Sequence, residues 1–113
     1  MNEYVKEINE SNFEQLVLQS EKPVLIDFWA KWCGPCRTLA PTVEAIAEQY
    51  AGVACVVKLN VDNNPSVVQR YRIQAIPTLI LFADGEEKDR IIGAASKDTI
   101  ARAIEARTGA ALN

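Results

Sequence analysis

Two runs of almost uninterrupted apolar residues constrain the fold of this 113-residue chain more than any other feature. They extend from Pro23 to Trp29 and from Val53 to Val61. A strand with one face in water alternates apolar and polar residues, whereas these runs place apolar side chains on both faces. We therefore expect each run to form a buried strand, the first of them in the centre of a sheet that is covered on both faces.

Helical patterns lie between and beside these runs. Residues 11–14 fit a capping box, in which a serine and a glutamate three positions later bond each other's backbone N–H groups, so a first helix is expected at about residues 11–19. Residues 33–50 are predicted to form a longer helix that Pro41 kinks. The apolar residues that recur on its inner face are Leu39, Val43, Ile46, Ala47 and Tyr50.

Cap and turn signals complete the order of elements. A short helix is expected from Asn64-Pro65 to about Tyr71, and a last helix between Ser96 and Gly109, with a frayed tail at residues 110–113. Asp84-Gly85 is typical of a tight hairpin turn. The remaining strands are predicted at residues 5–8, 78–82 and 88–92. The order βαβαβαββα predicts one α/β domain over residues 1–113, with a central mixed sheet and helices on both faces.

Composition and charge exclude several classes of function. The chain is 49% apolar and 24% charged, as in ordinary soluble domains, and its net charge of −3 includes no run of Lys or Arg. Neither nucleic acid nor a membrane is therefore expected as a partner. Residues 1–4 lack the start of a signal peptide, so a cytoplasmic location is predicted. The alternative is an organelle stroma or matrix after removal of a transit peptide.

The cysteine and histidine counts limit the chemistry further. The chain has three cysteines and no histidine, which excludes Cys/His zinc sites and His-based acid–base catalysis. Three cysteines cannot complete a four-cysteine site within one chain, so no metal site is expected. Cys55, in the second apolar run, is interpreted as a small core hydrophobe, and a regulatory thiol is the alternative.

Cys33 and Cys36 stand where the first apolar run gives way to the long helix. Residues three apart share a helical face, so the two sulfur atoms can close a small ring. Free N–H groups and the positive end of the helix dipole favour a thiolate at Cys33, the form that attacks a disulfide, and Cys36 would then resolve the mixed disulfide. A structural pair or half a metal site is the alternative, although neither would need Gly34 and Pro35, which are expected to tune the redox potential.

The motif Trp32-Cys33-Gly34-Pro35-Cys36, with the strand before it, closely resembles the thioredoxin family. Ile76-Pro77-Thr78 resembles the cis-proline loop of that family, and the resemblance covers nearly the whole chain. It implies the thioredoxin fold and a dithiol–disulfide oxidoreductase that reduces disulfides of target proteins through Cys33 and Cys36. Family members are known for a cysteine pKa of about 7 and a potential of about −270 mV.

The same resemblance implies cofactors and partners. The exchangeable Cys33–Cys36 disulfide is expected to be the redox group, with no other bound cofactor. The expected partners are disulfide-containing target proteins and a thioredoxin reductase linked to NADPH or ferredoxin, and the protein is expected to be a monomer. A redox-independent docking subunit of a larger assembly is the alternative function.

Asp27 interrupts the first apolar run with a carboxyl group. Burial disfavours the ionised form, so we expect a raised pKa and a role as the proton shuttle that deprotonates Cys36. A surface strand charge is the alternative. Lys58, in the second run, matches the lysine that the family places near this aspartate, and a snorkelling surface lysine is the alternative there.

A cis bond before Pro77 would turn the backbone of Ile76 toward the disulfide, ready to pair with an extended substrate strand. A trans proline at the start of a strand is the alternative. A flat apolar docking surface is expected from Trp32, Gly34, Ala75, Ile76, Pro77, Gly93 and Ala94.

Residues around the dithiol complete the expectations. Trp29 is expected to pack behind the active site. Lys31 and Arg37 place positive charges on both sides of the dithiol. Arg72 and Ala75 replace residues that are often glycine in the family, which leaves the choice of partner open but not the chemistry.

Overall fold

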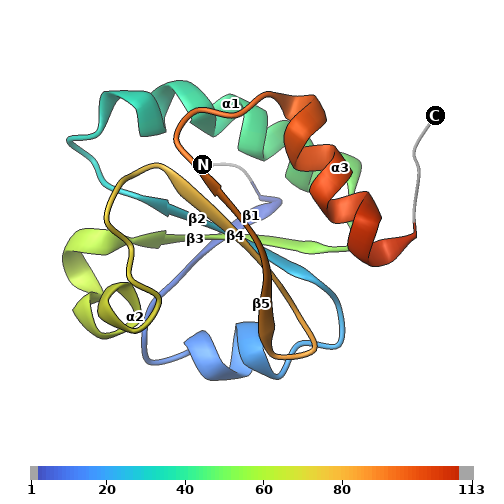
Figure 1. The fold of residues 1–113 in the computed structure, drawn as a ribbon, viewed down its shortest axis with the longest axis horizontal. Coiled ribbons are helices and arrows are strands. Elements are labelled where there is room, and N and C mark those ends of the chain that lie inside the picture. The colour runs from blue at the N-terminus through green and yellow to red at the C-terminus, as the bar shows by residue number, and fades with distance from the viewer. Residues whose placement is uncertain (1–2, 110–113) are drawn as a thin grey trace.

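Five strands form one mixed sheet in the order β1-β3-β2-β4-β5 (Figure 1). The structure, a computed structural model, describes residues 3–109. Strands β1, β3 and β2 are parallel, whereas β4 runs antiparallel to β2 and β5. The strands are β1 (Val5–Ile8), β2 (Val24–Trp29), β3 (Cys55–Asn60), β4 (Thr78–Ala83) and β5 (Glu86–Ile92). The thioredoxin-like α/β fold expected from the sequence is confirmed.

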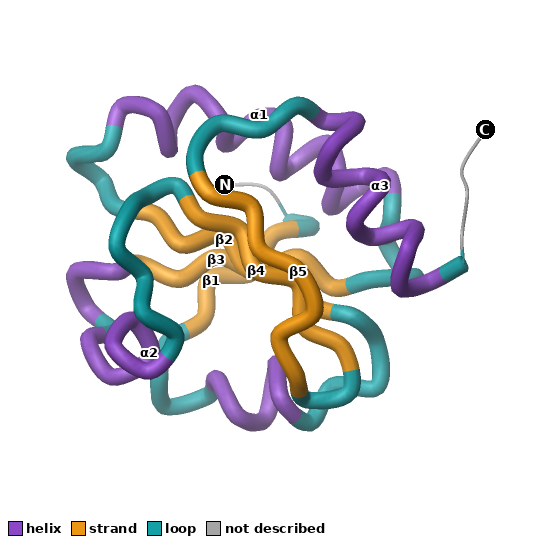
Figure 2. The backbone as a smooth tube through the Cα atoms, in the orientation of Figure 1, coloured by secondary structure: helices purple, strands orange, loops and turns teal. Residues whose placement is uncertain are grey.

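Helices cover both faces of this sheet (Figures 1 and 2). On one face lie α1 (Gly34–Gln49) and α3 (Lys97–Thr108), and on the other lie α2 (Pro65–Arg70) and a π-helical turn at Glu14–Leu18. A 3-10 turn at Val61–Asn63 follows β3. Within residues 3–109, no helix has both the length and the apolar character needed to cross a bilayer.

Strand β2 has its first five residues buried because it is hydrogen-bonded to β3 on one side and to β4 on the other. Its side chains alternate between the two layers of the core. Leu25 faces α1 and α3, whereas Ile26 and Phe28 face the π-helical turn and α2. The prediction of a buried central strand is confirmed. Four residues of α1 and the residue that follows it contribute to the first layer as expected: Leu39, Val43, Ile46, Ala47 and Tyr50.

The ends of several elements also follow the predicted signals. Ser96 accepts a hydrogen bond from the Thr99 N–H and caps α3, which ends at Gly109 with φ 70°. Asp84 and Gly85 have φ 55° and 78°, the backbone of a type I′ turn, so the predicted hairpin is confirmed. Residues 110–113, for which a frayed tail is predicted, lie outside the described residues.

Two local predictions are wrong. The capping box at residues 11–14 does not form, because the N–H groups of Ser11 and Asn12 bond the Asn9 side chain and the helical turn covers only Glu14–Leu18. Cys55 is exposed rather than part of the core. It is the first residue of β3, because the preceding residues still turn after α1, and at this end of the sheet it lines a shallow groove with Tyr4, Lys6 and Leu16.

Helix α2 ends in a Schellman motif with an arginine at the left-handed position. The Arg72 N–H bonds the Gln69 carbonyl and the Ile73 N–H bonds the Val68 carbonyl. Arg72 has φ 54°, a conformation that costs an L-residue energy and that glycine adopts freely. The backbone at position 72 therefore favours glycine, the residue that the family often has there.

We expect Arg72→Gly to raise the free energy of unfolding by roughly 0.5 to 1 kcal/mol, because the relieved left-handed strain outweighs the added freedom of the unfolded chain. Urea denaturation measures this change. Arg70→Gly is the matched control, since Arg70 lies in the last turn of α2 and glycine there should destabilise by about 1 kcal/mol. A loss of stability in both variants would contradict the assignment of strain to Arg72.

Candidate active site

Cys33 and Cys36 form a disulfide at the start of α1, where β2 delivers the chain to the helix. Their Cα atoms are 5.3 Å apart. Cys33 is the N-cap residue, and the Cys36 backbone N–H donates a hydrogen bond to its Sγ atom at 3.1 Å. Pro35 stands in the first turn, where a missing N–H removes no helical bond. Reduction of the disulfide would therefore leave the Cys33 sulfur facing an N–H donor that favours its thiolate form.

The loop before β4 lies directly beside the disulfide. The Ile76–Pro77 bond is cis, and the Ile76 carbonyl oxygen lies 3.8 Å from the Cys33 Sγ atom. The Gly93 N–H bonds the Pro77 carbonyl at 2.8 Å, which holds the loop against the end of β5. The structure thus brings Cys33, Ile76 and Gly93 together as the sequence predicts.

Several of the residues for which a flat docking surface is predicted line a groove instead. Trp32 is 68% exposed and its Nε1–H donates to Asp62. Ala75 and Ala94 are also exposed, Gly34, Ile76 and Gly93 are half-buried, and Pro77 is buried. A groove of about 410 Å³ is formed by residues of this surface together with neighbouring residues. The residues that line it are Trp32, Val61, Val68, Ile73, Gln74, Ala75 and Ile76.

A second groove lies along α1, the helix that begins at the dithiol. Its volume is about 400 Å³, and its lining residues are Pro35, Thr38, Leu39, Thr42, Ala94 and Ala95. Sequence reasoning missed Ile92, which is 64% exposed next to Gly93. The sequence signal that could have identified Ile92 as exposed was its position at the end of an edge strand, directly before a glycine. Cys33 itself is only 4% exposed, and two of its neighbours, Ile76 and Pro35, each line one of the two grooves.

Asp27 lies beneath the disulfide and is 5% exposed. It lines a small, partly open cavity of about 120 Å³ with Cys36, Ala40 and Lys58, among other residues. Burial raises the pKa of Asp27 from 3.8 to about 7, and the Lys58 charge offsets only part of this shift. Its Oδ1 atom has no hydrogen-bond partner among residues 3–109. The carboxyl group can therefore take up or release a proton near neutral pH, next to Cys36.

Lys58, Trp29 and Arg37 also line this cavity. Lys58 lies opposite Asp27 in the pairing of β2 with β3 and is half-buried. Its Nζ atom is 4.7 Å from the centre of a Trp29 ring, within the range of a cation–π contact. Trp29 packs against Ala30, Cys33 and Cys36, which confirms its predicted place behind the active site.

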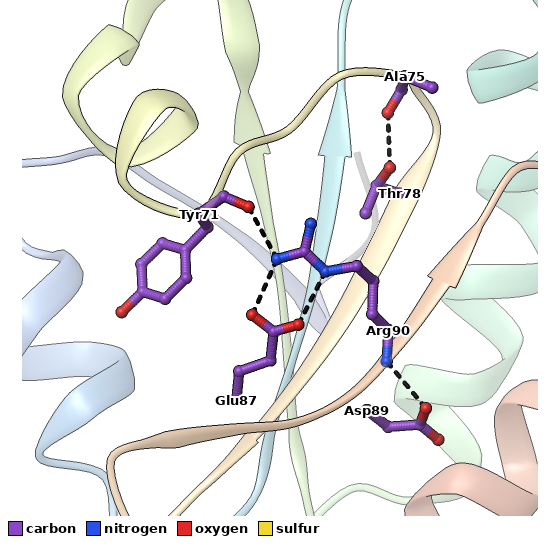
Figure 3. A network of polar contacts seen from close by, with 6 residues as sticks. All are labelled: Tyr71, Ala75, Thr78, Glu87, Asp89 and Arg90. Atoms are coloured by element: carbon purple, nitrogen blue, oxygen red, sulfur yellow. Dashed lines mark hydrogen bonds and ion pairs between the residues drawn. The ribbon is translucent and has the colours of Figure 1, made fainter.

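Two polar arrangements near the site were not foreseen from the sequence. Arg37, expected only as a flanking charge, donates from Nη1 to the Lys31 carbonyl at 2.6 Å and so spans the outside of the dithiol turn. Figure 3 shows a second network, in which Arg90 bonds Glu87 and the Tyr71 carbonyl, and Thr78 bonds the Ala75 carbonyl. This network surrounds the loop that carries Ile76.

Within the described part of the chain, no group of three or more His, Cys, Asp or Glu residues is placed to hold a metal ion. The arrangement supports thiol–disulfide exchange, since the disulfide, a buried carboxyl group and an exposed apolar surface meet at the start of one helix.

Comparison with known proteins agrees with this geometry. The family model described as Thioredoxin matches residues 4–106. The chain is 50% identical over 99 residues to Thioredoxin 1 of Nostoc sp., covering 88% of this chain and 92% of that protein. It is 46% identical over 101 residues to the chloroplastic M-type thioredoxin of Spinacia oleracea, covering 89% of this chain and 56% of that protein. It thus spans about half the length of this plant relative.

The family match covers both segments that build the site, the dithiol turn and the cis-proline loop. The chain therefore belongs to the thioredoxin family and is a thiol–disulfide oxidoreductase whose redox-active centre is the Cys33–Cys36 disulfide.

Proposed function

We propose that the protein reduces disulfides in target proteins that dock an extended segment beside the dithiol. The observation that carries this proposal is the position of the Cys33 sulfur, 3.8 Å from the carbonyl oxygen of Ile76, a residue that lines the apolar groove beside Trp32. A target segment pairs with the backbone of Ile76, and its side chains enter the grooves beside Trp32 and Ala94. Ala75, Pro77, Gly34 and Gly93 complete the docking surface.

The reaction proceeds by two exchanges. The Cys33 thiolate attacks one sulfur of the target disulfide, which breaks the target S–S bond, forms a mixed disulfide and releases one target thiolate. The Cys36 thiolate then attacks the Cys33 sulfur, which forms the Cys33–Cys36 disulfide and releases the second target thiolate. Two electrons pass from the dithiol to the target.

Asp27 is the base for the second exchange. Cys36 must lose its proton before it attacks, and the buried Asp27 lines the same small cavity as Cys36. Lys58, on the same cavity, limits the rise of the Asp27 pKa so that the carboxylate is available near neutral pH. Gly34 and Pro35 tune the potential of the pair.

Family membership implies disulfide-containing targets and a reductase as partners. We propose a single-domain monomer with no bound cofactor beyond the disulfide, regenerated by an NADPH- or ferredoxin-linked thioredoxin reductase. The cytoplasm or an organelle stroma is the proposed location. Relatives described as chloroplastic M-type thioredoxins and cyanobacterial thioredoxins support both locations.

We expect Cys36→Ser to trap targets as stable mixed disulfides at Cys33, because the second exchange has lost its nucleophile. Non-reducing electrophoresis and mass spectrometry of adducts with insulin, which has accessible disulfides, measure the trapping. Cys33→Ser is the matched control and should trap nothing at position 33. The assignment of Cys33 as the attacking thiol would be contradicted if Cys33→Ser trapped targets through Cys36 while Cys36→Ser trapped none. Trapping through the exposed Cys55 alone would contradict it as well.

We expect Asp27→Asn to slow release of the target by about tenfold or more, with less than about a threefold effect on the first attack. In the unsubstituted protein the rate of release should rise with pH through about 7, as Asp27 ionises, and the variant should lose this dependence. Rapid-mixing tryptophan fluorescence resolves the two steps.

Glu48→Gln is the control for this comparison, since Glu48 lies exposed on α1, the helix that carries Cys36. It should change neither step. An equal effect of Asp27→Asn on attack and on release would show that Asp27 is not the base for Cys36.

A further inference from the structure

We infer that Arg90 is a positioning residue for target docking, which together with Glu87 holds the loop that presents the Ile76 backbone beside Cys33. The inference rests on the proposed function, because it concerns how targets bind to the surface that surrounds the dithiol. It assigns a task to the contacts of Arg90 with Glu87 and Tyr71 in Figure 3, three residues that belong neither to the dithiol and the buried carboxyl group nor to the docking surface.

A β-bulge in β5 makes the network possible. Residues three apart in a regular strand point to opposite faces of the sheet. The pairing of β4 with β5 shifts between Leu81 and Phe82. Leu81 pairs with Asp89 and the next residue, Phe82, pairs with Glu87, so Lys88 has no partner in β4 and forms the bulge. Glu87 and Arg90 therefore share one face of the sheet, the face of their partners Phe82 and Ile80.

The shared face allows a two-point ion pair. Arg90 donates from Nε and Nη2 to the two carboxylate oxygens of Glu87, at 2.7 and 2.8 Å. The side chains are only 26% and 31% exposed, respectively, and the hydrogen bond from Arg90 lowers the pKa of Glu87. This geometry fixes the plane of the guanidinium group, which a single contact would leave free to rotate.

The fixed guanidinium group points its Nη2 atom at the end of α2. This atom also donates to the Tyr71 carbonyl at 2.7 Å, as Figure 3 shows. The Tyr71 ring packs edge-on against Phe82, with centroids 5.1 Å apart, so Tyr71 is held by its ring as well as by the bond to its carbonyl group. Arg72, in its left-handed conformation, follows directly and begins the loop.

Strand β5 and the residue that directly follows it thus hold both ends of the same loop. Arg90 bonds Tyr71 at the start, and the Gly93 N–H bonds Pro77 at the end. Between these anchors, Arg72, Gln74 and Ala75 are exposed, and residues 73–76 line the groove beside Trp32. A loop held in its binding conformation loses less entropy when a target docks, so the anchor at Arg90 strengthens binding without touching the target.

The test separates docking from thiol chemistry by using two substrates. Insulin requires docking of a polypeptide, whereas a small aromatic disulfide needs only an accessible Cys33 sulfur. For Arg90→Gln we expect the KM for insulin to rise roughly threefold to tenfold. The kcat for insulin and the rate with the small disulfide should stay within about twofold, since no catalytic group is altered.

Two further variants keep the test decisive if Arg90→Gln folds poorly. Arg90→Lys keeps the charge but cannot make the two-point pair. Glu87→Gln removes the ion pair that orients the Arg90 guanidinium group toward the Tyr71 carbonyl. Both should raise the KM less than Arg90→Gln. The matched control is Lys88→Gln, which breaks the neighbouring Lys88–Glu86 pair on the same strand and should leave the KM unchanged.

An unchanged KM for insulin in folded Arg90→Gln would overturn the inference. Equal losses with insulin and with the small disulfide, or a similar rise of the KM in Lys88→Gln, would overturn it as well, because they indicate a general structural effect. Failure of the unsubstituted protein to reduce the small disulfide would instead contradict the proposed dithiol chemistry, so the two failures are distinguishable.

Discussion

The pairing of β2 on both of its edges is the constraint on which the rest of the structure depends. Strands β3 and β4 pair with the two edges of β2 and fix its position in the sheet. The end of β2, from which the chain enters α1, is therefore fixed as well. The N-cap residue of α1 is Cys33, whose sulfur accepts the Cys36 N–H. Strand β4 begins beside the same end of β2, so the loop before it brings Ile76 to the disulfide.

Strand β2 also carries Asp27, whose ionised form lowers the stability of the fold. A pKa raised from 3.8 to about 7 means that ionised Asp27 destabilises the fold by an amount on the order of 4 kcal/mol. Between these two pH values the folded protein keeps a proton that the unfolded chain releases, so stability falls as the pH rises from about 4 to about 7 and then levels off. A fold that retains this carboxyl group beside Cys36 gives up stability for a base that titrates near neutral pH.

Most features that depend on local signals were predicted from the sequence, the capping box at residues 11–14 being an exception, whereas features that depend on register were missed. The buried strands, the cap at Cys33 and the turn at Asp84-Gly85 follow from patterns within a few residues, and the structure contains them. The family resemblance added the meeting of Cys33 with Ile76, which no local pattern contains. The pairing of Arg90 with Glu87 requires the bulge in β5, and a bulge leaves no clear signal in a sequence. The exposure of Cys55 likewise depends on where β3 begins.

The reduction potential of the Cys33/Cys36 pair tests the central claim most directly. The protein would be equilibrated in graded dithiol and disulfide buffers, followed by tryptophan fluorescence because Trp29 packs against both cysteines, with thiol trapping to confirm which residues oxidise. The account predicts a potential on the order of −270 mV or lower, below the glutathione poise, as a reductant requires. A potential near −120 mV, that of an oxidant, would contradict it.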